Sequence, residues 1–319
     1  MSGGRDLKIQ AVAELVFAGA IWGFGFVATI WALRSMGPMA MTGWRFILAA
    51  VLGISLALVI PSLRQHVTLV QLKLSFIPGI LVCLMLGLQT WGLKYTTATK
   101  GGFITTLYVL VVPLLEMWWR KRPLPRFHFF YVALGLLGVA LICDLPSDIL
   151  EQMRTMGPTL PKAVITSRER WNIGDFLTLL CAIAASAHII YLGFIQKKIG
   201  SAFVFNCLQS FWAALIPLSL AFAIEESPHL NWQDLSLPGF LSLLFASTMI
   251  AFALQVRAQK VLSPSLSSLL FLLESPFAAF FAVLLLHEHV SGAQWIGAAL
   301  ILLATAGSVW SSTAPRALS

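Results

Sequence analysis

One acidic residue stands in the middle of an otherwise uncharged stretch of the chain. Glu274 lies about halfway along the apolar run 261–286, which contains no other charged residue. A carboxyl group at the centre of a membrane-spanning helix costs roughly 2.5–3.5 kcal/mol on insertion scales, so it is expected to face a cavity or a polar partner. Pro276 has no backbone N–H for the carbonyl of Leu272, which would leave a free acceptor beside the acid. The pattern predicts a polar notch, in which Glu274 either serves function or only locks helix packing through a hydrogen bond.

A histidine lies at a similar depth in a second apolar run. His188 is in the run 176–196, where it is either a polar contact for a ligand or a neutral imidazole satisfied by a backbone or hydroxyl group. Further aromatic and polar side chains would line one amphipathic pocket with these two, although each alone is more often a packing residue. They are Trp22, Tyr108, Gln209 and Trp212 near the middle of the membrane, with Gln89 and Arg45 nearer the outer face.

Three potential metal ligands follow one another directly after the run 261–286. They are His287, Glu288 and His289. Consecutive residues are a poor ligand set for one metal ion, so a loop or a helix cap is expected here. The sequence also has no Gly-x-x-x-x-Gly-Lys loop for nucleotide phosphates and no His-x-x-x-His pair. We therefore expect the protein to have no metal site and no cofactor, and not to be an enzyme.

The composition explains why these polar residues stand out. Of the 319 residues, 58% are apolar and only 11% are charged, against roughly 45–50% and about 25% in soluble domains. So few charges do not cover the surface of a soluble protein of this length, and lipid is the expected solvent. The net charge of +8 does not indicate a nucleic-acid partner, because the basic residues separate the apolar runs and do not gather on one face.

The apolar runs have the length of membrane spans. A hydrocarbon core of about 30 Å needs about 20 helical residues. Ten runs are candidates, the fourth being extended past Glu116 to Trp119: 15–33, 46–63, 74–93, 101–115, 127–143, 176–196, 199–224, 235–256, 261–286 and 290–315. The predicted fold class is an all-α integral membrane protein with ten transmembrane helices.

The distribution of Lys and Arg predicts the orientation in the membrane. These residues collect in cytoplasmic loops. An N-terminus in the cytoplasm places thirteen of the 21 Lys and Arg residues inside: Arg5, Lys8, Arg64, Lys73, Arg120, Lys121, Arg122, Arg126, Lys197, Lys198, Arg257, Lys260 and Arg316. Seven fall outside, four of them in the long segment 144–171, which counts least. We therefore expect both termini in the cytoplasm and an extracytoplasmic linker over 144–171.

The two halves of the chain show weak internal similarity. A shift of 163 residues places Lys94 on Arg257 and Pro113 on Pro276, and a shift of 162 places Gly135 on Gly297. Because each half has an odd number of spans, the two halves would be inverted repeats, over residues 1–143 and 172–319, with substrate bound between them near the bilayer midplane. Pro113 and Pro276 are the expected hinges, since proline removes a backbone hydrogen bond.

The repeat also bears on the two polar candidates. Under the same shift, Glu274 and His188 fall on Val111 and Gly25 of the first half. The scaffold therefore does not require polar groups at these positions. Polar chemistry in one half alone favours a functional role.

Several short motifs resemble a known family. They are Trp22-Gly23-Phe24-Gly25-Phe26, Trp44-Arg45-Phe46, Tyr95-Thr96-Thr97-Ala98, Gly102-Phe103, Leu107, Pro113, Ala258, Leu262-Ser263-Pro264, Glu274-Ser275-Pro276, Glu288 and Gly297. Their order and spacing resemble the drug/metabolite transporter superfamily, specifically its EamA-type ten-helix members, over nearly the whole chain. The resemblance implies a carrier of the bacterial inner membrane that exports amino acids or other metabolites.

The expected function is secondary active transport of a small organic metabolite by alternating access. The first candidate is export of an amino acid or a related metabolite. The eight candidate residues would form its substrate and proton pathway. Proton coupling, uptake or facilitated passage by the same fold, and a homodimer stay open. A membrane-embedded enzyme or a sensor is a remote alternative, since no catalytic set and no extended soluble domain is seen in the sequence.

Overall fold

The structure is a computed structural model that describes residues 2–121, 126–142, 172–225, 227–289 and 291–313. Within these ranges every regular element is a helix. The helices are α1 Ser2–Ala32, α2 Pro38–Val59, α3 Pro61–Arg64, α4 Leu69–Leu74, α5 Phe76–Leu93, α6 Ala98–Thr105, α7 Tyr108–Arg120, α8 Arg126–Ile142, α10 Ile173–Ile195, η2 Gln196–Lys198, α11 Ala202–Ile224, α12 Ser236–Ser242, η3 Leu243–Ala251, α13 Phe252–Ala258, α14 Pro264–Phe271, α15 Glu274–Leu286 and α16 Gly292–Thr313. The expected linker, 144–171, lies outside the described residues.

The described helices have the length and composition of membrane spans. Eight segments are long and apolar enough to cross a bilayer, and shorter apolar segments lie in α8 and α16. The eight are Asp6–Ala32, Pro38–Val59, Phe76–Leu93, Ala98–Trp119, Ile173–Lys198, Ala202–Ile224, Ser236–Ala258 and Pro264–Leu286. The prediction of an all-helical, multi-pass membrane protein is confirmed.

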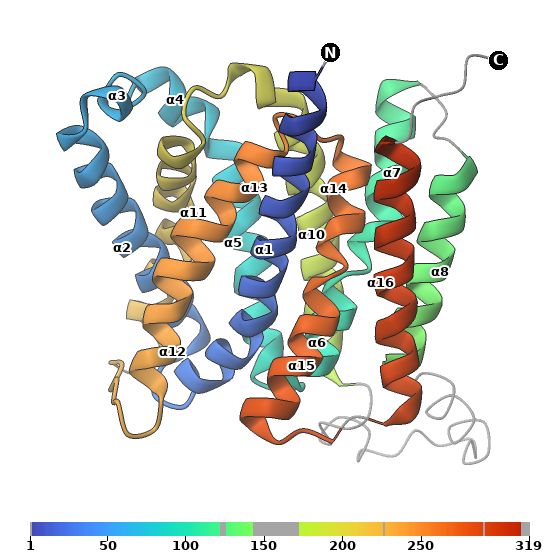
Figure 1. The fold of residues 1–319 in the computed structure, drawn as a ribbon. Coiled ribbons are helices and arrows are strands. Elements are labelled where there is room, and N and C mark those ends of the chain that lie inside the picture. Colours follow the sequence, from blue (N-terminus) through green and yellow to red (C-terminus); the bar gives the residue numbers. More distant parts are fainter. Residues whose placement is uncertain (1, 122–125, 143–171, 226, 290, 314–319) are drawn as a thin grey trace.

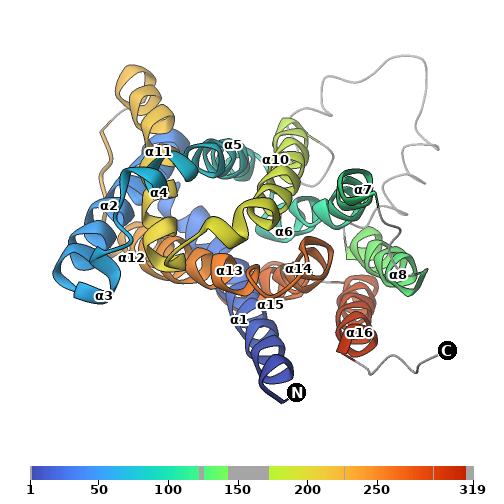
Figure 2. The same cartoon turned by 90° about the horizontal axis from the view of Figure 1, so that it is seen from above.

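The helices pack as pairs drawn from the two halves of the chain. α2 lies along α11, and α8 lies along α16 (Figures 1 and 2). Both views place these two pairs at opposite edges of the bundle, with α1 and α10 between them. α1 packs closely on α15, because Gly23 has no Cβ, and a Cβ there would come within 2.5 Å of the Cβ of Phe277. Figure 1 also shows the first residues of α1 and the last residues of α16 at the same end of the bundle.

Carboxylates from distant helices complete several helix N-termini. Glu225, directly after α11, accepts hydrogen bonds from the backbone N–H groups of Met39 and Ala40, at 2.9 and 2.7 Å. Glu116 accepts from the backbone N–H of Ser265 at 2.8 Å and from its hydroxyl group. These bonds satisfy N–H groups that a helix leaves unpaired at its start, and thus fix the ends of α2 and α14 to other helices.

Two of the spans are broken near their middle. One consists of α6 and α7, separated by Thr106 and Leu107, and the other of α14 and α15, separated by Leu272 and Leu273. The parts have equal lengths, eight and thirteen residues in each case. Side-chain hydroxyls of Thr97 and Ser263 cap the first part of each span.

The breaks correct two expectations from the sequence. The break in the first span and the break in the second are 166 residues apart in the sequence. At this separation Glu274 aligns with Tyr108, and Pro113 no longer aligns with Pro276. The carbonyl of Leu272 is also not free, because it accepts the backbone N–H of Ser275 at 3.2 Å in a tighter turn. Both prolines lie after a break, Pro113 in the second turn of α7 and Pro276 in the first turn of α15.

Candidate functional site

A cavity of about 60 Å³ lies in the middle of the bundle. By the volume that a single water needs, it has room for roughly four to six water-sized groups. Its wall includes six of the eight candidate residues: Trp22, Arg45, Gln89, Tyr108, His188 and Glu274. Thr29, Thr105, Ser247 and Gln255 add polar atoms, and the other lining side chains are mostly apolar or aromatic. The cavity therefore combines apolar walls with a few polar groups, as small-molecule sites do.

Glu274 and Tyr108 meet where the two broken helices cross. Each is the first residue after the break in its span, and the Tyr108 hydroxyl donates to Glu274 Oε2 at 3.4 Å. Glu274 is 7% exposed. Its place at the start of α15 also sets the carboxylate near the positive end of the helix dipole. The predicted polar notch thus exists, and its partner is a phenol from the other half of the chain.

A second contact ties the two breaks together. Thr106 Oγ1 and Ser275 Oγ share a hydrogen bond of 3.1 Å, and Ser275 also donates to the carbonyl of Gly102 at 3.0 Å. The backbones approach closely here, since a Cβ on Gly102 would lie 2.9 Å from the Cβ of Ala278. The wall of the cavity that carries Glu274 is therefore held by hydrogen bonds on both sides of the crossing.

His188 belongs to a chain of polar side chains that leads away from the cavity. Its Nε2 lies 3.3 Å from Gln209 Oε1, and Gln209 Nε2 donates to Asn206 Oδ1 at 2.9 Å. Asn206 in turn donates to the carbonyl of Thr248 at 2.8 Å. Gln209 thus stands behind His188 and outside the cavity wall. Nδ1 of His188 is buried without a hydrogen-bond partner among the described residues.

Arg45 reaches the cavity from α2. Its Nε donates to Thr248 Oγ1 at 2.9 Å and its Nη2 to Ser247 Oγ at 3.2 Å. Both acceptors lie in η3, a π-helix of nine residues. Arg45 is 3% exposed, and the described ion pairs do not include it. Its guanidinium is therefore held inside the bundle by neutral groups, namely these two hydroxyls and the ring of Phe46, whose centroid lies 5.1 Å away.

The two candidate tryptophans have different surroundings. Trp22 packs edge-on against Phe252 and Phe271, with ring centroids 5.2 and 5.3 Å away, and its indole N–H is buried without a described partner. Trp212 does not line the cavity. It packs on Phe76 and donates its indole N–H to the carbonyl of Leu72 at 2.9 Å. The expected place of Trp212 in the pocket is therefore replaced by a packing role beside α5.

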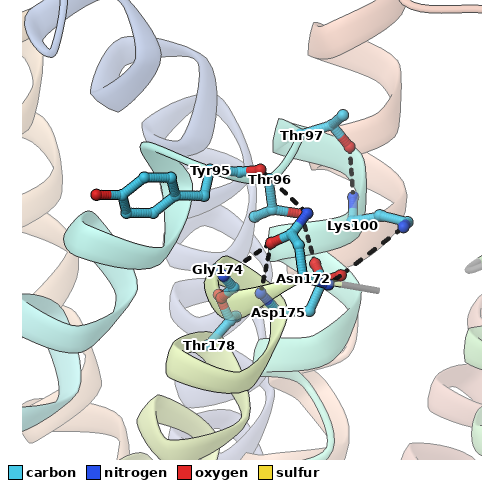
Figure 3. Close-up of polar contacts among 8 residues, drawn as sticks. All are labelled: Tyr95, Thr96, Thr97, Lys100, Asn172, Gly174, Asp175 and Thr178. Atoms are coloured by element: carbon cyan, nitrogen blue, oxygen red, sulfur yellow. Dashed lines mark hydrogen bonds and ion pairs between the residues drawn. The ribbon is translucent and has the colours of Figure 1, made fainter. Parts of the chain in front are cut away.

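A buried network at the end of the bundle opposite the start of α1 joins α10 to the segment before α6 (Figure 3). Asp175 is fully buried, accepts the Thr96 hydroxyl at 2.6 Å and lies 3.8 Å from Lys100 Nζ. Asn172 and Asp175 form a capping box at the start of α10, and the Asn172 side chain also donates to the carbonyl of Tyr95 at 3.1 Å. These contacts close this end of the interface between the two halves.

An ion pair occupies the other end. Arg257, in the last turn of α13, donates two hydrogen bonds to Glu14 of α1, at 2.9 and 2.6 Å. Lys260 follows and donates to the carbonyls of Ile199 and Gly200, while partial burial lowers the pKa of its ammonium group. The cavity thus lies between two polar contacts that link the halves at opposite ends.

The His287-Glu288-His289 stretch forms a helix cap. Glu288 accepts the backbone N–H of Ala98 at 3.3 Å and the hydroxyl group of Thr99. Its carboxylate therefore completes the N-terminus of α6, as Glu116 completes that of α14. The described residues hold no group of three His, Cys, Asp or Glu side chains arranged for a metal ion.

Sequence reasoning missed several residues of this arrangement. Asn206, Thr248 and Thr106 gave no signal, because hydroxyl and amide side chains are common in apolar helices and often bond only to their own backbone. Asp175 had a usable signal, since Asn172 three residues earlier and the apolar run that follows are typical of a capped helix start.

A bundle of apolar spans around a buried, partly polar cavity is an arrangement found in membrane transporters. The chain belongs to the EamA-like transporter family, whose model matches residues 11–143 and 172–310. This membership is consistent with the drug/metabolite transporter superfamily.

Three relatives are also named as transporters. A protein of Archaeoglobus fulgidus described as an uncharacterized transporter is 28% identical over 93% of this chain and 85% of its own length. The uncharacterized transporter YoaV of Bacillus subtilis is 20% identical over 92% of this chain and 94% of its own length. An uncharacterized transporter of Synechocystis is 27% identical over 68% of this chain and 64% of its own length. A protein of known crystal structure has the same fold, with a TM-score of 0.70 and 18% sequence identity. The match covers 97% of this chain and all of the other chain.

Proposed function

We propose that this protein is a secondary active transporter that exports a small amino acid or a related metabolite across the bacterial inner membrane. The observation that carries the proposal is Glu274 in the wall of a small cavity, at the crossing of two broken helices. An acid inside a membrane bundle is costly and marks a substrate or ion pathway. Broken helices that meet at a central site are typical of transporters.

The proposal includes ten spans arranged as two inverted five-helix repeats. The equal parts of the broken spans and the two stretches matched by the family model support it. So do the contacts at the two ends, Glu14 with Arg257 and Asp175 with Thr96 and Lys100. In alternating access, one of these contacts opens while the other stays closed.

Glu274 is proposed to couple substrate movement to protons. A carboxylate in a poorly solvated cavity can hold either a proton or the ammonium group of a substrate, and the two compete for it. Binding a proton on one side and an ammonium group on the other is the minimal requirement of an antiporter. The Tyr108 hydroxyl would bond to the acid in either state, since a phenol both donates and accepts.

The test measures flux of labelled amino acids in proteoliposomes with and without an imposed pH gradient. Glu274→Gln keeps the shape but removes the charge, so it is expected to abolish gradient-driven flux while leaving folding intact. Glu116→Gln is the matched control, because it removes a carboxylate that is also buried but lies at a helix cap, away from the cavity. Flux of the Glu274→Gln protein that still follows the pH gradient would return Glu274 to a packing role.

An uptake permease or a facilitator with the same fold is the second candidate. It predicts flux that follows the substrate gradient alone and is unaffected by pH. The same proteoliposomes separate the cases, because outward pumping against a substrate gradient occurs only with coupling.

A further inference from the structure

Arg45 carries a positive charge into the membrane-spanning bundle. It lies seven residues after the start of α2 at Pro38, which is about 10 Å along the helix axis. Its side chain lines the same cavity as Glu274 and is 3% exposed. An arginine in this position is costly unless it meets an opposite charge.

The protein itself supplies no such charge in the part that the structure describes. The ion pairs found there join Glu14 to Arg257 and Lys100 to Asp175. Arg45 is instead bonded to the hydroxyl groups of Ser247 and Thr248. A guanidinium has five N–H donors, and these two bonds use one on Nε and one on Nη2. The remaining donors are available to an anion that enters the cavity.

The helix opposite Arg45 is η3, and its side chains fix the position of the guanidinium. Ser247 and Thr248 lie in the π-helix η3, and the Thr248 hydroxyl that accepts from Arg45 donates to the carbonyl of Leu243 at 2.8 Å. Asn206 satisfies the backbone carbonyl of Thr248. π-Helices are rare and occur frequently at functional sites. The guanidinium also lies over the ring of Phe46, 5.1 Å from its centroid. It is thus oriented by groups that carry no negative charge.

We propose that Arg45 binds the carboxylate of the transported molecule, so that the substrate must carry an acidic group as well as an amine. The planar fork of a guanidinium matches the two oxygens of a carboxylate. This inference rests on the proposed function, which assigns the ammonium group to Glu274. The cavity of about 60 Å³ favours a small molecule, and the two opposite charges in its wall favour a zwitterion. The unpartnered Nδ1 of His188 and Nε1 of Trp22 are further polar contacts for it.

The experiment compares matched ligands on the purified full-length protein. Glycine and the nineteen standard L-amino acids are first screened by the rise in Tm that they cause, and Kd is then measured for those that bind. Each binder is then compared with its amide and with its decarboxylated amine. For wild type, we expect both analogues to bind about 10- to 100-fold more weakly, because a charge-assisted pair of hydrogen bonds is lost.

Substitutions at Arg45 separate binding from packing. In Arg45→Gln, the amino acid should bind as weakly as its amide, so that the difference between the ligands nearly disappears. Arg45→Lys keeps the charge and so guards against failure to fold, and it should reduce the preference for the amino acid by about 3- to 10-fold, since the fork is lost. The matched control is Arg34→Gln, since Arg34 is an exposed residue after the end of α1 and donates to the carbonyl of Asp234. It should keep the full preference.

The outcomes distinguish this inference from the proposed function. Amines that bind wild type as tightly as amino acids, or Arg45 variants that fully keep the preference, would overturn the role of Arg45 and leave transport unaffected. If no amino acid binds, acetate, L-lactate and succinate are tested on the same variants. Binding of these acids that depends on Arg45 supports the anion site and contradicts the ammonium role of Glu274. Absence of binding by both sets contradicts both proposals.

Discussion

Buried polar side chains in this protein have two different roles, capping helices and lining the cavity. Glu116, Glu225 and Glu288 accept backbone N–H groups at helix starts, and so they join helices that are far apart in the sequence. Arg45 and Glu274 instead face a cavity. Their hydrogen-bond partners among the described residues are hydroxyl groups, and the Arg45 guanidinium also lies over the ring of Phe46, 5.1 Å from its centroid. A side chain whose bonds are completed by backbone is explained by folding alone. The two cavity charges are not, and this difference makes them the candidates for binding.

Asp234 gives a pH-dependent prediction at the residue scale. Hydrogen bonds from Ser236 and Ser35 hold the pKa of its carboxyl at about 2, below the usual 3.8. The folded state therefore binds this proton less readily than the unfolded state, and the resulting stability is present at neutral pH and lost as the pH falls from about 4 towards 2. Asp234→Asn should lower the Tm at pH 7 and pH 5.

The difference in Tm between wild type and this variant is expected to narrow below about pH 4. Ser35→Ala removes one of the donors and should reproduce part of the loss. Thermal unfolding of the detergent-solubilised protein between pH 7 and pH 2.5 measures it. A difference that stays constant over this range would show that Asp234 acts through shape and not through charge.

The sequence was most informative about single polar residues in long apolar runs. Glu274 and His188 could be found because burying them is costly, which leaves few positions for them other than a cavity or a polar partner. Trp212 could not be assigned, since a tryptophan in an apolar helix has the same sequence pattern whether its N–H faces a cavity or, as here, the carbonyl of Leu72. The roles of Ser247 and Thr248 depend on which helix lies opposite, and a single sequence does not contain that information.

At the scale of elements, the two broken spans are the part that sequence periodicity predicted least well. Fixed shifts of 162 and 163 residues aligned the two halves in the sequence, whereas the breaks match at 166. Small length differences in turns and helix ends displace the register, and a fixed shift does not follow them. Proline marked the right spans but not the break, because the tight turns lie at Thr106–Leu107 and Leu272–Leu273, before Pro113 and Pro276.

The prolines nevertheless permit a prediction about movement. Pro276→Ala would supply an N–H that competes with Ser275 for the Leu272 carbonyl, and Pro113→Ala would add a bond inside α7. Both changes stiffen a span beside its break. The double variant should therefore slow substrate exchange several-fold, while the Kd for substrate changes little.

Exchange rates in proteoliposomes and Kd values of the purified protein test this separately. Pro217→Ala is the matched control, because Pro217 lies inside the unbroken helix α11. Its effect on exchange should be small. Unchanged exchange in the double variant would assign Pro113 and Pro276 to packing.

Contacts between the two halves of the chain lie at both ends of the molecule. Opening one end requires separating Arg257 from Glu14, and opening the other requires separating Asp175 from Thr96. Each contact contains a buried or half-buried carboxylate, so its loss must be offset by new partners or by water entering the interface. The cavity lies between these ends. A transporter that works by alternating access must keep at least one end closed at all times to avoid leakage.

The final prediction concerns how the molecule sits in the membrane. Figure 1 places the start of α1 and the end of α16 at one end of the bundle, and the excess of Lys and Arg in the loops expected at that end predicts that it faces the cytoplasm. The loop after α11 then faces outward, and Gln233 is exposed there. Single cysteines at Ser2, Gln233 and Ser312, in a chain whose four native cysteines are replaced, can be probed with an impermeant thiol reagent. We expect labelling in intact cells at position 233 alone, and labelling at positions 2 and 312 only after the membrane is permeabilised. Labelling at position 2 or 312 in intact cells, or no labelling at position 233, would contradict this orientation. The end of the bundle with the start of α1 would then face outward.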